Sequence, residues 1–302
     1  MPSRRHDLLA RLVPRVRRSR ELDSEAAERA RVERWHATLD RTFPTRLVPG
    51  FDRRFCVVTE ELGDFAVHVM TPRHVVPERT VLHVHGGGFM APVDAFHVRF
   101  LARLARDLRA RVVVPDYPLA PEHTWRDSFE PLVGLAARWA DPATGGRLTL
   151  SGDSAGGGYA LAIAQAVRDR GGPQPSELLL LSPWGDLSTS TPETAAYDAV
   201  DPWLFLGKLH AYARWWAGSE ADLTRPEVSP ALGDLAGLPR ALMLCGTRDL
   251  LLPGCRLLAR RAAESGWDLT YVEEPGLLHV YPLLPFLPEA RLARRRILEF
   301  LR

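Results

Sequence analysis

Residues 148–165 read LTLSGDSAGGGYALAIAQ, an apolar run that ends in small residues and continues as an alanine-rich run. Ser154 stands between Gly152 and Gly156, the G-x-S-x-G spacing of a tight turn from a strand into a helix. Such a turn needs neighbours without a Cβ atom, which the two glycines supply. The spacing predicts a serine hydroxyl presented at the start of a helix. Taken alone, the stretch also fits a glycine-rich turn with an incidental serine.

Composition limits the protein classes to consider. The chain has 302 residues, 46% of them hydrophobic, and a net charge of +2. This size and composition suit one large α/β domain, or one domain with a small lid, and the near-neutral charge does not favour nucleic-acid binding. No apolar stretch reaches membrane-spanning length, and the basic N-terminus lacks the apolar core of a signal peptide, so we expect no stable membrane insertion. Cys56, Cys245 and Cys255 match neither a disulfide framework nor a C-x-x-C metal pattern, which predicts a reducing, cytoplasmic location.

Strand-like and helix-like runs alternate along most of the chain. We expect strands at 53–59, 64–71, 79–86, 111–116, 148–153, 177–183, 240–246 and 268–274. We expect helices at 23–41, 94–109, 127–140, 154–165, 202–217, 253–265 and 286–301. The first helix would present Leu22, Ala26, Val32, Trp35 and Leu39 on one face. The alternation after residue 79 predicts a mostly parallel central sheet with helices on both faces.

A serine hydroxyl is a weak nucleophile and needs a base, for which histidine is suited. In a parallel sheet, reactive groups gather at the carboxyl ends of the strands. Two histidines follow Ser154 in the chain. His279 comes just after the last expected strand, whereas His210 lies inside a tryptophan-rich helix, so we prefer His279. Its alternative role is that of a packed loop histidine.

The imidazole in turn needs a carboxylate that fixes its tautomer and stabilises its cation. Asp249 and Asp186 each follow an expected strand. Asp249 follows the strand directly before that of His279, which would bring the two side chains together. We therefore prefer Asp249 and keep Asp186 as the alternative. An aspartate at this place could also serve only as a helix N-cap.

An oxyanion formed during acyl transfer needs hydrogen-bond donors placed in advance. The N–H of Ala155, the residue after the serine, is one candidate. The stretch HVHGGGF at 83–89 follows another expected strand, and Gly87 and Gly88 are the further candidates. His83 and His85 could also be read as a metal pair, but the sequence places no third ligand. We expect neither a metal nor a cofactor.

Taken together, these motifs resemble the hormone-sensitive lipase family of α/β-hydrolase esterases, in particular its bacterial members, over roughly residues 79–290. The matching parts, in order, are HGGGF at 85–89, DYPLAPEH at 116–123, GDSAGG at 152–157, SPW at 182–184, DPW at 201–203, Asp249 and His279. The resemblance implies an α/β-hydrolase fold with Ser154 as nucleophile, Asp249 as acid and His279 as base. It implies an oxyanion hole formed by Gly87, Gly88 and Ala155.

The resemblance also implies a lid. We expect residues 1–50 to form an N-terminal helical cap segment and residues 51–302 a catalytic domain with a lid insertion near 184–220. Four tryptophans are candidates to line an apolar substrate pocket, with core or lid packing as their alternative. They are Trp184, Trp203, Trp215 and Trp216. Asp116 and Glu122 are expected to hold the loop below the site rather than to act in catalysis.

The sequence departs from the family pattern where Pro118, Pro253 and Val280 replace an arginine, an acidic residue and a glycine. These departures leave the expected chemistry intact and the substrate open. We expect hydrolysis of short- to medium-chain carboxylic esters, with a lactone hydrolase or natural-product deacetylase as alternative. Two non-enzymes remain as remote alternatives: a small-molecule receptor, which would lack the histidine found at His279, and a binding protein with a vestigial hydrolase domain. The expected partner is a small-molecule ester or lactone, and a homodimer stays open.

Overall fold

The computed structural model describes residues 2–17, 23–144 and 147–302. In this part of the chain, eight strands form one sheet in the order β1-β2-β4-β3-β5-β6-β7-β8. Only the pairs β1/β2 and β2/β4 are antiparallel; the other neighbours are parallel. The strands are β1 (Phe55–Leu62), β2 (Phe65–Pro72), β3 (Arg79–Val84), β4 (Ala110–Pro115), β5 (Leu148–Asp153), β6 (Glu177–Leu181), β7 (Ala241–Arg248) and β8 (Leu269–Leu278).

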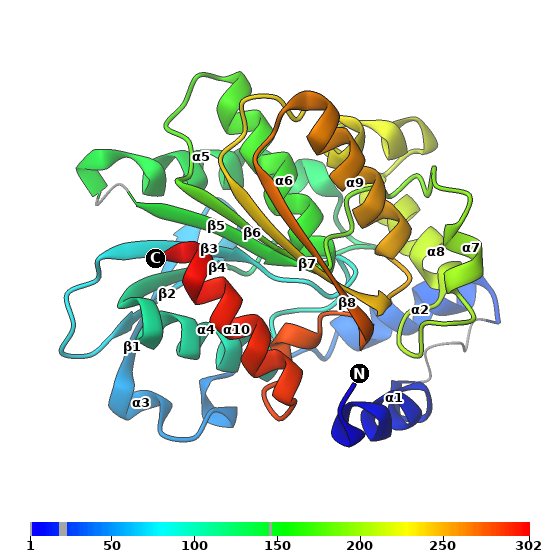
Figure 1. Ribbon diagram of the computed structural model, residues 1–302, viewed down its shortest axis with the longest axis horizontal. Helices are drawn as coiled ribbons and strands as arrows, with labels where there is room; N and C mark the ends of the chain where they lie inside the picture. Colours follow the sequence, from blue (N-terminus) through cyan, green and yellow to red (C-terminus); the bar gives the residue numbers. More distant parts are fainter. Residues whose placement is uncertain (1, 18–22, 145–146) are drawn as a thin grey trace.

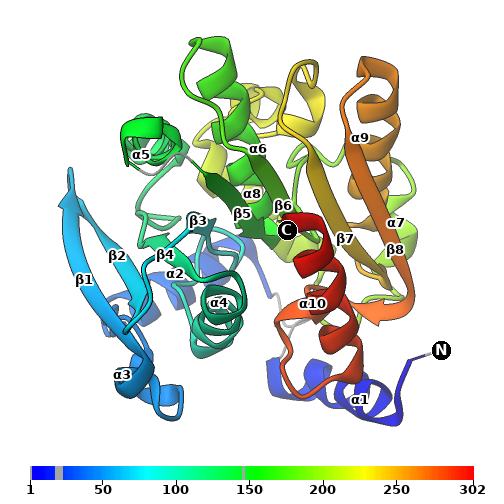
Figure 2. The same cartoon turned by 60° about the vertical axis from the view of Figure 1, so that its left-hand side comes forward.

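Helices cover both faces of this sheet (Figures 1 and 2). One face packs against α5 (Phe129–Ala140), α6 (Ser154–Asp169) and α9 (Leu252–Ser265). The other packs against α4 (Ala95–Leu108) and α10 (Pro288–Leu301). Strand β6 shows why two layers are needed: Leu178 and Leu180 belong to the first core, Leu179 and Leu181 to the second. A strand that is apolar on both faces must be covered on both.

The remaining helices are α1 (Arg4–Arg17), α2 (Glu25–His36), α3 (Phe51–Arg54), α7 (Thr194–Tyr197) and α8 (Leu206–Ala217). In Figure 1, α2 and α8 lie near the carboxyl ends of β7 and β8. The mostly parallel central sheet predicted from the sequence, with helices on both faces, is confirmed. Within the described residues, no helix combines the length and apolar composition needed to cross a bilayer.

The expected helix at 23–41 is shorter, because α2 ends at His36. Its expected apolar face is confirmed in part: Val32 is buried and Trp35 and Leu39 are half-buried, whereas Ala26 is exposed, Leu22 lies outside the described residues, and the second buried position is Glu28. Glu28 is tolerated there because it is fully paired. Arg31 donates to both of its carboxylate oxygens, and the hydroxyl of Tyr212 on α8 donates to one of them.

Glu25 makes a second link between α2 and α8. Its carboxylate accepts hydrogen bonds from the Arg214 guanidinium and from the Trp215 indole. Two acidic side chains of α2, one turn apart, therefore fasten this helix to α8. These hydrogen bonds join residues that are at least 184 positions apart in the sequence. They hold the N-terminal segment in place beside the sheet.

Candidate active site

The turn at Ser154 has the geometry that its neighbouring glycines allow. Ser154 is the first residue of α6 and has a φ of +52°, a left-handed conformation that costs energy for a residue with a side chain. A Cβ atom on Gly152 would lie 2.2 Å from the carbonyl oxygen of Gly156, and one on Gly156 would lie 2.1 Å from that of Val84. Both positions therefore require glycine, and the strained turn presents the serine side chain at the end of β5.

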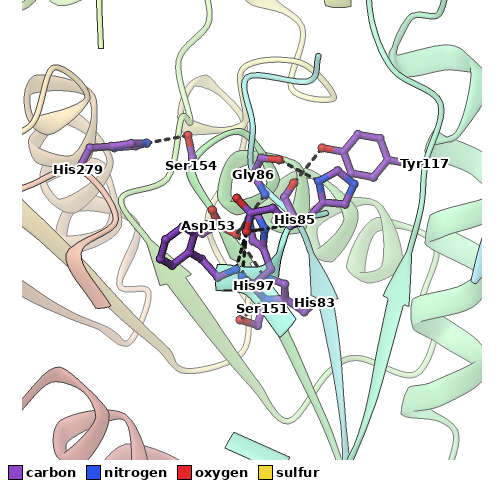
Figure 3. Close-up of polar contacts among 11 residues, drawn as sticks. His83, His85, Gly86, His97, Tyr117, Ser151, Asp153, Ser154 and His279 are labelled. Atoms are coloured by element: carbon purple, nitrogen blue, oxygen red, sulfur yellow. Dashed lines mark hydrogen bonds and ion pairs between the residues drawn. The ribbon is translucent and has the colours of Figure 1, made fainter. Parts of the chain in front are cut away.

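Ser154, His279 and Asp249 form a continuous hydrogen-bonded chain. The Oγ atom of Ser154 lies 2.9 Å from Nε2 of His279, and Nδ1 of His279 lies 2.9 Å from Oδ2 of Asp249. Figure 3 shows the imidazole pointing at the serine hydroxyl. Asp249 is fully buried, His279 is 3% exposed and Ser154 is 8% exposed, so the chain runs from the interior to a partly open surface.

The two alternative residues lie elsewhere. The carboxylate of Asp186 accepts hydrogen bonds from the side chains of Ser188 and Ser190 in its own loop. His210 is a half-buried residue of α8. Asp249, by contrast, directly follows β7 and also accepts the backbone N–H of Leu251. The sheet thus brings the preferred residues together and leaves the alternatives in other contacts.

Electrostatics favour a histidine that gains a proton readily. Burial alone would lower the pKa of His279, but the adjacent Asp249 carboxylate outweighs that effect and raises the pKa above its usual value. Asp201 adds to this field. Its own pKa is raised to about 6, first by burial and then by the neighbouring Asp249 carboxylate. The arrangement stabilises an imidazolium, the form a base takes after it accepts a proton.

The three predicted oxyanion donors come from two elements next to Ser154. Ala155 is the second residue of α6, where a backbone N–H has no acceptor within the helix. Gly87 and Gly88 have φ values of +112° and +65° and line a cavity beside Ser154. Such φ values require glycine and let the loop backbone approach a ligand closely.

That cavity has a volume of about 410 Å³. Ser154 and His279 open into it, and its walls come from α2, the loop after β3, the start of α4, α8 and the segment after β8. The apolar wall residues include Trp35, Met90, Phe96, Trp203, Leu209, Tyr212, Leu283 and Leu284. This volume falls within the range of small-molecule sites.

Of the four tryptophans predicted for this pocket, the structure places one on its wall. Trp203 lines the cavity, with its ring edge-on to that of His279 at 6.2 Å. Trp216 is fully buried and stacks on Phe89 at 4.3 Å. Trp184 packs on the same phenylalanine, and Trp215 donates to Glu25. These three contribute to the core or to the α2–α8 contact, because their rings point into layers already closed by other side chains.

Asp116 and Glu122, the loop residues expected to support the site, contact the end of α2 and the segment that follows it. Arg41 donates to both carboxylate oxygens of Asp116 and to the carbonyl of Tyr117. Nδ1 of His36 lies 2.8 Å from the Glu122 carboxylate. The N-terminal segment therefore reaches the loop at residues 116–122 from the same side as the cavity.

Sequence reasoning missed three residues that the structure places around the site. Asp201 accepts the backbone N–H of Trp203 and that of Leu250, so it connects the cavity wall to the loop of Asp249. Asp153 and His97 form a buried ion pair directly below Ser154. The DPW motif at 201–203 and the aspartate of GDSAGG were visible signals. No sequence signal distinguished His97.

His83 and His85, which could be read from the sequence as a metal pair, contact other groups of the protein. His83 has Ser151 and Asp153 as side-chain partners. His85 stacks on Tyr117 at 4.4 Å, and burial lowers its pKa to about 4. In the part of the chain that the structure describes, no three metal-binding side chains converge on a common point.

Comparison with known proteins places this geometry in a family. A family model described as the alpha/beta hydrolase fold matches residues 81–283. An acetyl-hydrolase of Streptomyces hygroscopicus is 32% identical over 286 residues, covering 89% of this chain and 92% of that protein. Esterase LipI of Mycobacterium tuberculosis is 39% identical over 211 residues, covering 67% of this chain and 65% of that protein.

Solved structures agree with these sequence matches. An esterase from the bacterial hormone-sensitive lipase family superposes with a TM-score of 0.81 at 28% identity, covering 100% of this chain and 98% of that one. The esterase EstE5, in crystals soaked with p-nitrophenyl butyrate, has a TM-score of 0.80 at 26% identity, covering 99% and 98%. The chain belongs to the α/β-hydrolase fold family, and the predicted resemblance to bacterial hormone-sensitive-lipase-type esterases is confirmed.

Proposed function

We propose that this protein is a serine carboxylesterase that hydrolyses short- to medium-chain carboxylic esters. The observation that carries the proposal is the chain of two 2.9 Å contacts from Ser154 through His279 to Asp249 at the edge of the cavity. A hydroxyl, a base and an orienting carboxylate in this order define nucleophilic acyl transfer. The reaction needs neither a metal nor a cofactor.

In the first half-reaction, Oγ of Ser154 bonds to the acyl carbon while Nε2 of His279 takes the hydroxyl proton. The carbonyl electrons move to oxygen, and the N–H groups of Gly87, Gly88 and Ala155 stabilise the oxyanion. When the tetrahedral intermediate collapses, the ester bond breaks and the leaving alcohol takes the proton from His279. Water repeats the sequence on the acyl-enzyme, releasing the acid and restoring the serine hydroxyl.

The substrate proposal rests on the cavity and on the relatives. A cavity of about 410 Å³ with a largely apolar wall suits an ester of modest size. The match to an acetyl-hydrolase favours a second candidate, removal of an acetyl group from a natural product. A lactone is a cyclic ester and would use the same residues. We further propose that residues 1–50 form a helical cap segment and residues 51–302 the catalytic domain, which contains a lid insertion near 184–220.

The three cysteines are free thiols, with Cys245 and Cys255 buried, which supports a reducing, cytoplasmic location. Assembly as a homodimer stays a prediction, which the mass in solution would test.

Covalent labelling tests the proposed chemistry directly. A fluorophosphonate probe should add once to the wild-type protein, at Ser154, as measured by intact-protein mass spectrometry and peptide mapping. Ser154→Ala should lose the label and about 10⁴–10⁶-fold in kcat on p-nitrophenyl esters, by analogy with serine-protease triads. A panel of p-nitrophenyl esters, acetylated alcohols and lactones then separates the substrate classes. A label that persists in Ser154→Ala would refute the nucleophile.

A further inference from the structure

A buried ionic group lies directly below the nucleophile. Asp153 ends β5, precedes Ser154 and is 2% exposed. Its Oδ1 atom lies 3.0 Å from the backbone nitrogen of Gly86, 3.1 Å from Nε2 of His83 and 3.4 Å from Nε2 of His97. Figure 3 shows the Asp153 side chain directed toward these groups, whereas the adjacent Ser154 side chain points to His279.

His97 provides the positive charge of this group. Its ring lies between two carboxylates, because Nδ1 is 2.9 Å from Oδ1 of Asp94 while Nε2 faces Asp153. The backbone nitrogen of Asp94 is also 3.0 Å from Nδ1, but a carboxylate is the stronger partner for a protonated ring nitrogen. Burial alone would lower the pKa of His97, yet the two carboxylates raise it to about 10. The ring is therefore an imidazolium at neutral pH.

The same charge pair keeps Asp153 ionised. Burial would raise the pKa of this carboxyl, but His97 and His83 outweigh burial and hold it well below its usual range. A charged acceptor makes stronger hydrogen bonds than a neutral one. The backbone N–H of Gly86 is thus held by an acceptor that belongs to the strand of the nucleophile.

Gly86 begins the loop that carries the oxyanion donors. A Cβ atom on Gly86 would lie 2.3 Å from Oδ2 of Asp153, so the loop backbone rests directly on this carboxylate. On the other side, the hydroxyl of Tyr117 donates to the carbonyl of His85 at 2.8 Å. The peptide before the donors is therefore fixed at both ends, and the next two residues, Gly87 and Gly88, line the cavity.

We infer that Asp153 and His97 are positioning residues that set the distance between the oxyanion donors and the nucleophile. Asp153 ties Gly86 to the strand that carries Ser154, and His97 keeps that link charged and ties it to the start of α4. The inference rests on the proposed esterase function and deepens it. Both residues border the cavity, but in the described contacts neither side chain is hydrogen-bonded to Ser154 or His279; both act through the backbone of residues 86–88.

A misplaced oxyanion hole affects the transition state and leaves the ground state almost unchanged. Removing one donor of such a hole costs about 10²–10³ in kcat. Substrate binding in the apolar cavity does not depend on these donors, so KM should stay within about threefold. A purely structural role would instead lower the folded fraction and leave the kinetic constants of the folded protein intact.

The experiment compares three variants of the full-length chain with a matched control. Asp153→Ala removes the acceptor, Asp153→Asn keeps an oxygen for the Gly86 N–H without the charge, and His97→Gln removes the cation. Glu177→Gln is the control, because Glu177 is a buried carboxylate, 2% exposed and paired with Arg147 and Arg240, that begins β6 at the opposite end of the strands. Each protein is assayed for Tm, kcat and KM on p-nitrophenyl butyrate, and inhibition by an alkyl trifluoromethyl ketone.

The ketone adds to the serine and forms an oxyanion, so its affinity reports the donors. We expect kcat to fall about 10²–10³-fold in Asp153→Ala. We expect a smaller, roughly tenfold loss in Asp153→Asn and His97→Gln, because the acceptor oxygen is retained. Ketone affinity should fall by the same factor as kcat/KM, with KM little changed. Glu177→Gln should lower Tm without changing kcat or ketone affinity.

Unchanged kcat and ketone affinity in Asp153→Asn and His97→Gln would overturn the inference, as would losses confined to KM or equal losses in Glu177→Gln. These two milder variants decide the question if Asp153→Ala does not fold. Fluorophosphonate labelling of the wild type separates this result from the proposed function. A labelled, active wild type with unaffected variants removes only the positioning role, whereas an unlabelled wild type removes both.

Discussion

Nδ1 of His279 lies 2.9 Å from Oδ2 of Asp249, and the residues that precede them, Leu278 and Arg248, are partners in the sheet. The contact between acid and base is therefore a consequence of strand register. Parallel neighbours place their carboxyl ends at the same edge, so the first residue beyond each strand meets its counterpart. The shift in register between Gly246 and Arg248 falls just before this point, where it changes the direction of the strand ends.

We propose that this register makes Asp249 the residue that orients His279. Asp249→Asn should leave the fold intact and lower kcat about 10⁴-fold, because an amide favours the wrong imidazole tautomer. Asp186→Asn is the matched comparison, since Asp186 is also buried and follows the adjacent strand but bonds only to nearby serines among the contacts described. Steady-state kinetics on p-nitrophenyl butyrate distinguish the two. A larger loss in Asp186→Asn would transfer the acid role to that residue.

The pH dependence should report the base. The free enzyme is active when His279 is neutral, so kcat/KM should rise with pH through the pKa of this residue and then level off. The Asp249 carboxylate raises that pKa above its usual value, against the effect of burial, so the midpoint should lie above the ordinary value of about 6.5. Asp249→Asn should shift the midpoint of the residual activity downward. Profiles measured from about pH 5 to 9 check this, and an unchanged midpoint contradicts it.

Substrate length should follow the size of the cavity. Each methylene that enters an apolar slot adds about 0.8 kcal/mol, but a chain longer than the slot adds nothing. With about 410 Å³ available, kcat/KM should be highest for short acyl chains and fall beyond about eight carbons. Trp203→Ala removes a bulky side chain from the wall and enlarges the cavity. The acyl chain length with the highest kcat/KM should therefore increase.

Trp139→Ala is the control for that substitution, because Trp139 lies on α5 against Arg111 and Arg138, away from the cavity wall. It should leave the chain-length profile unchanged. A wild-type preference for emulsified long-chain triglycerides would show that the cavity does not limit the substrate and that the enzyme is a true lipase.

Glu28 should couple the N-terminal segment to the cavity. Its carboxylate is buried and binds Arg31 and Tyr212, and Nζ of Lys208 lies 3.6 Å away. Arg31, Lys208 and Tyr212 all line the cavity. Glu28→Gln should lower stability by about 1–3 kcal/mol and raise KM, because these side chains lose their common partner.

Glu33→Gln on the same helix removes an exposed pair with Arg29 and should change neither Tm nor KM measurably. Thermal unfolding and kinetics on p-nitrophenyl butyrate compare the two variants. Deletion of residues 1–40 should have a stronger effect in the same direction while Ser154 remains open to the fluorophosphonate probe. Equal effects of the two glutamates would contradict a special role for the buried one.

Much of the fold could be predicted from local patterns in the sequence. The alternation of strands and helices after residue 79 predicted the parallel sheet, and strand and helix ends differ from the predicted ones by a few residues. The helix at 23–41 was predicted too long, since periodicity alone does not mark where α2 ends. The burial of Val32 was predicted, but that of Glu28 was not, because its hydrogen bond to Tyr212 on α8 exists only in the folded structure.

The turn at Ser154 follows from the local sequence, because a left-handed residue between strand and helix depends on the glycines next to it. Which of the predicted tryptophans lines the cavity, by contrast, depends on tertiary packing. Indole rings fill core layers and ligand cavities equally well, and of the four predicted tryptophans only Trp203 lies where those layers leave space, together with Trp35 of α2. The ion pair of Asp153 and His97 likewise joins residues 56 positions apart through the packing of α4 against β4 and β2, since a buried charge persists only where the fold brings it a partner.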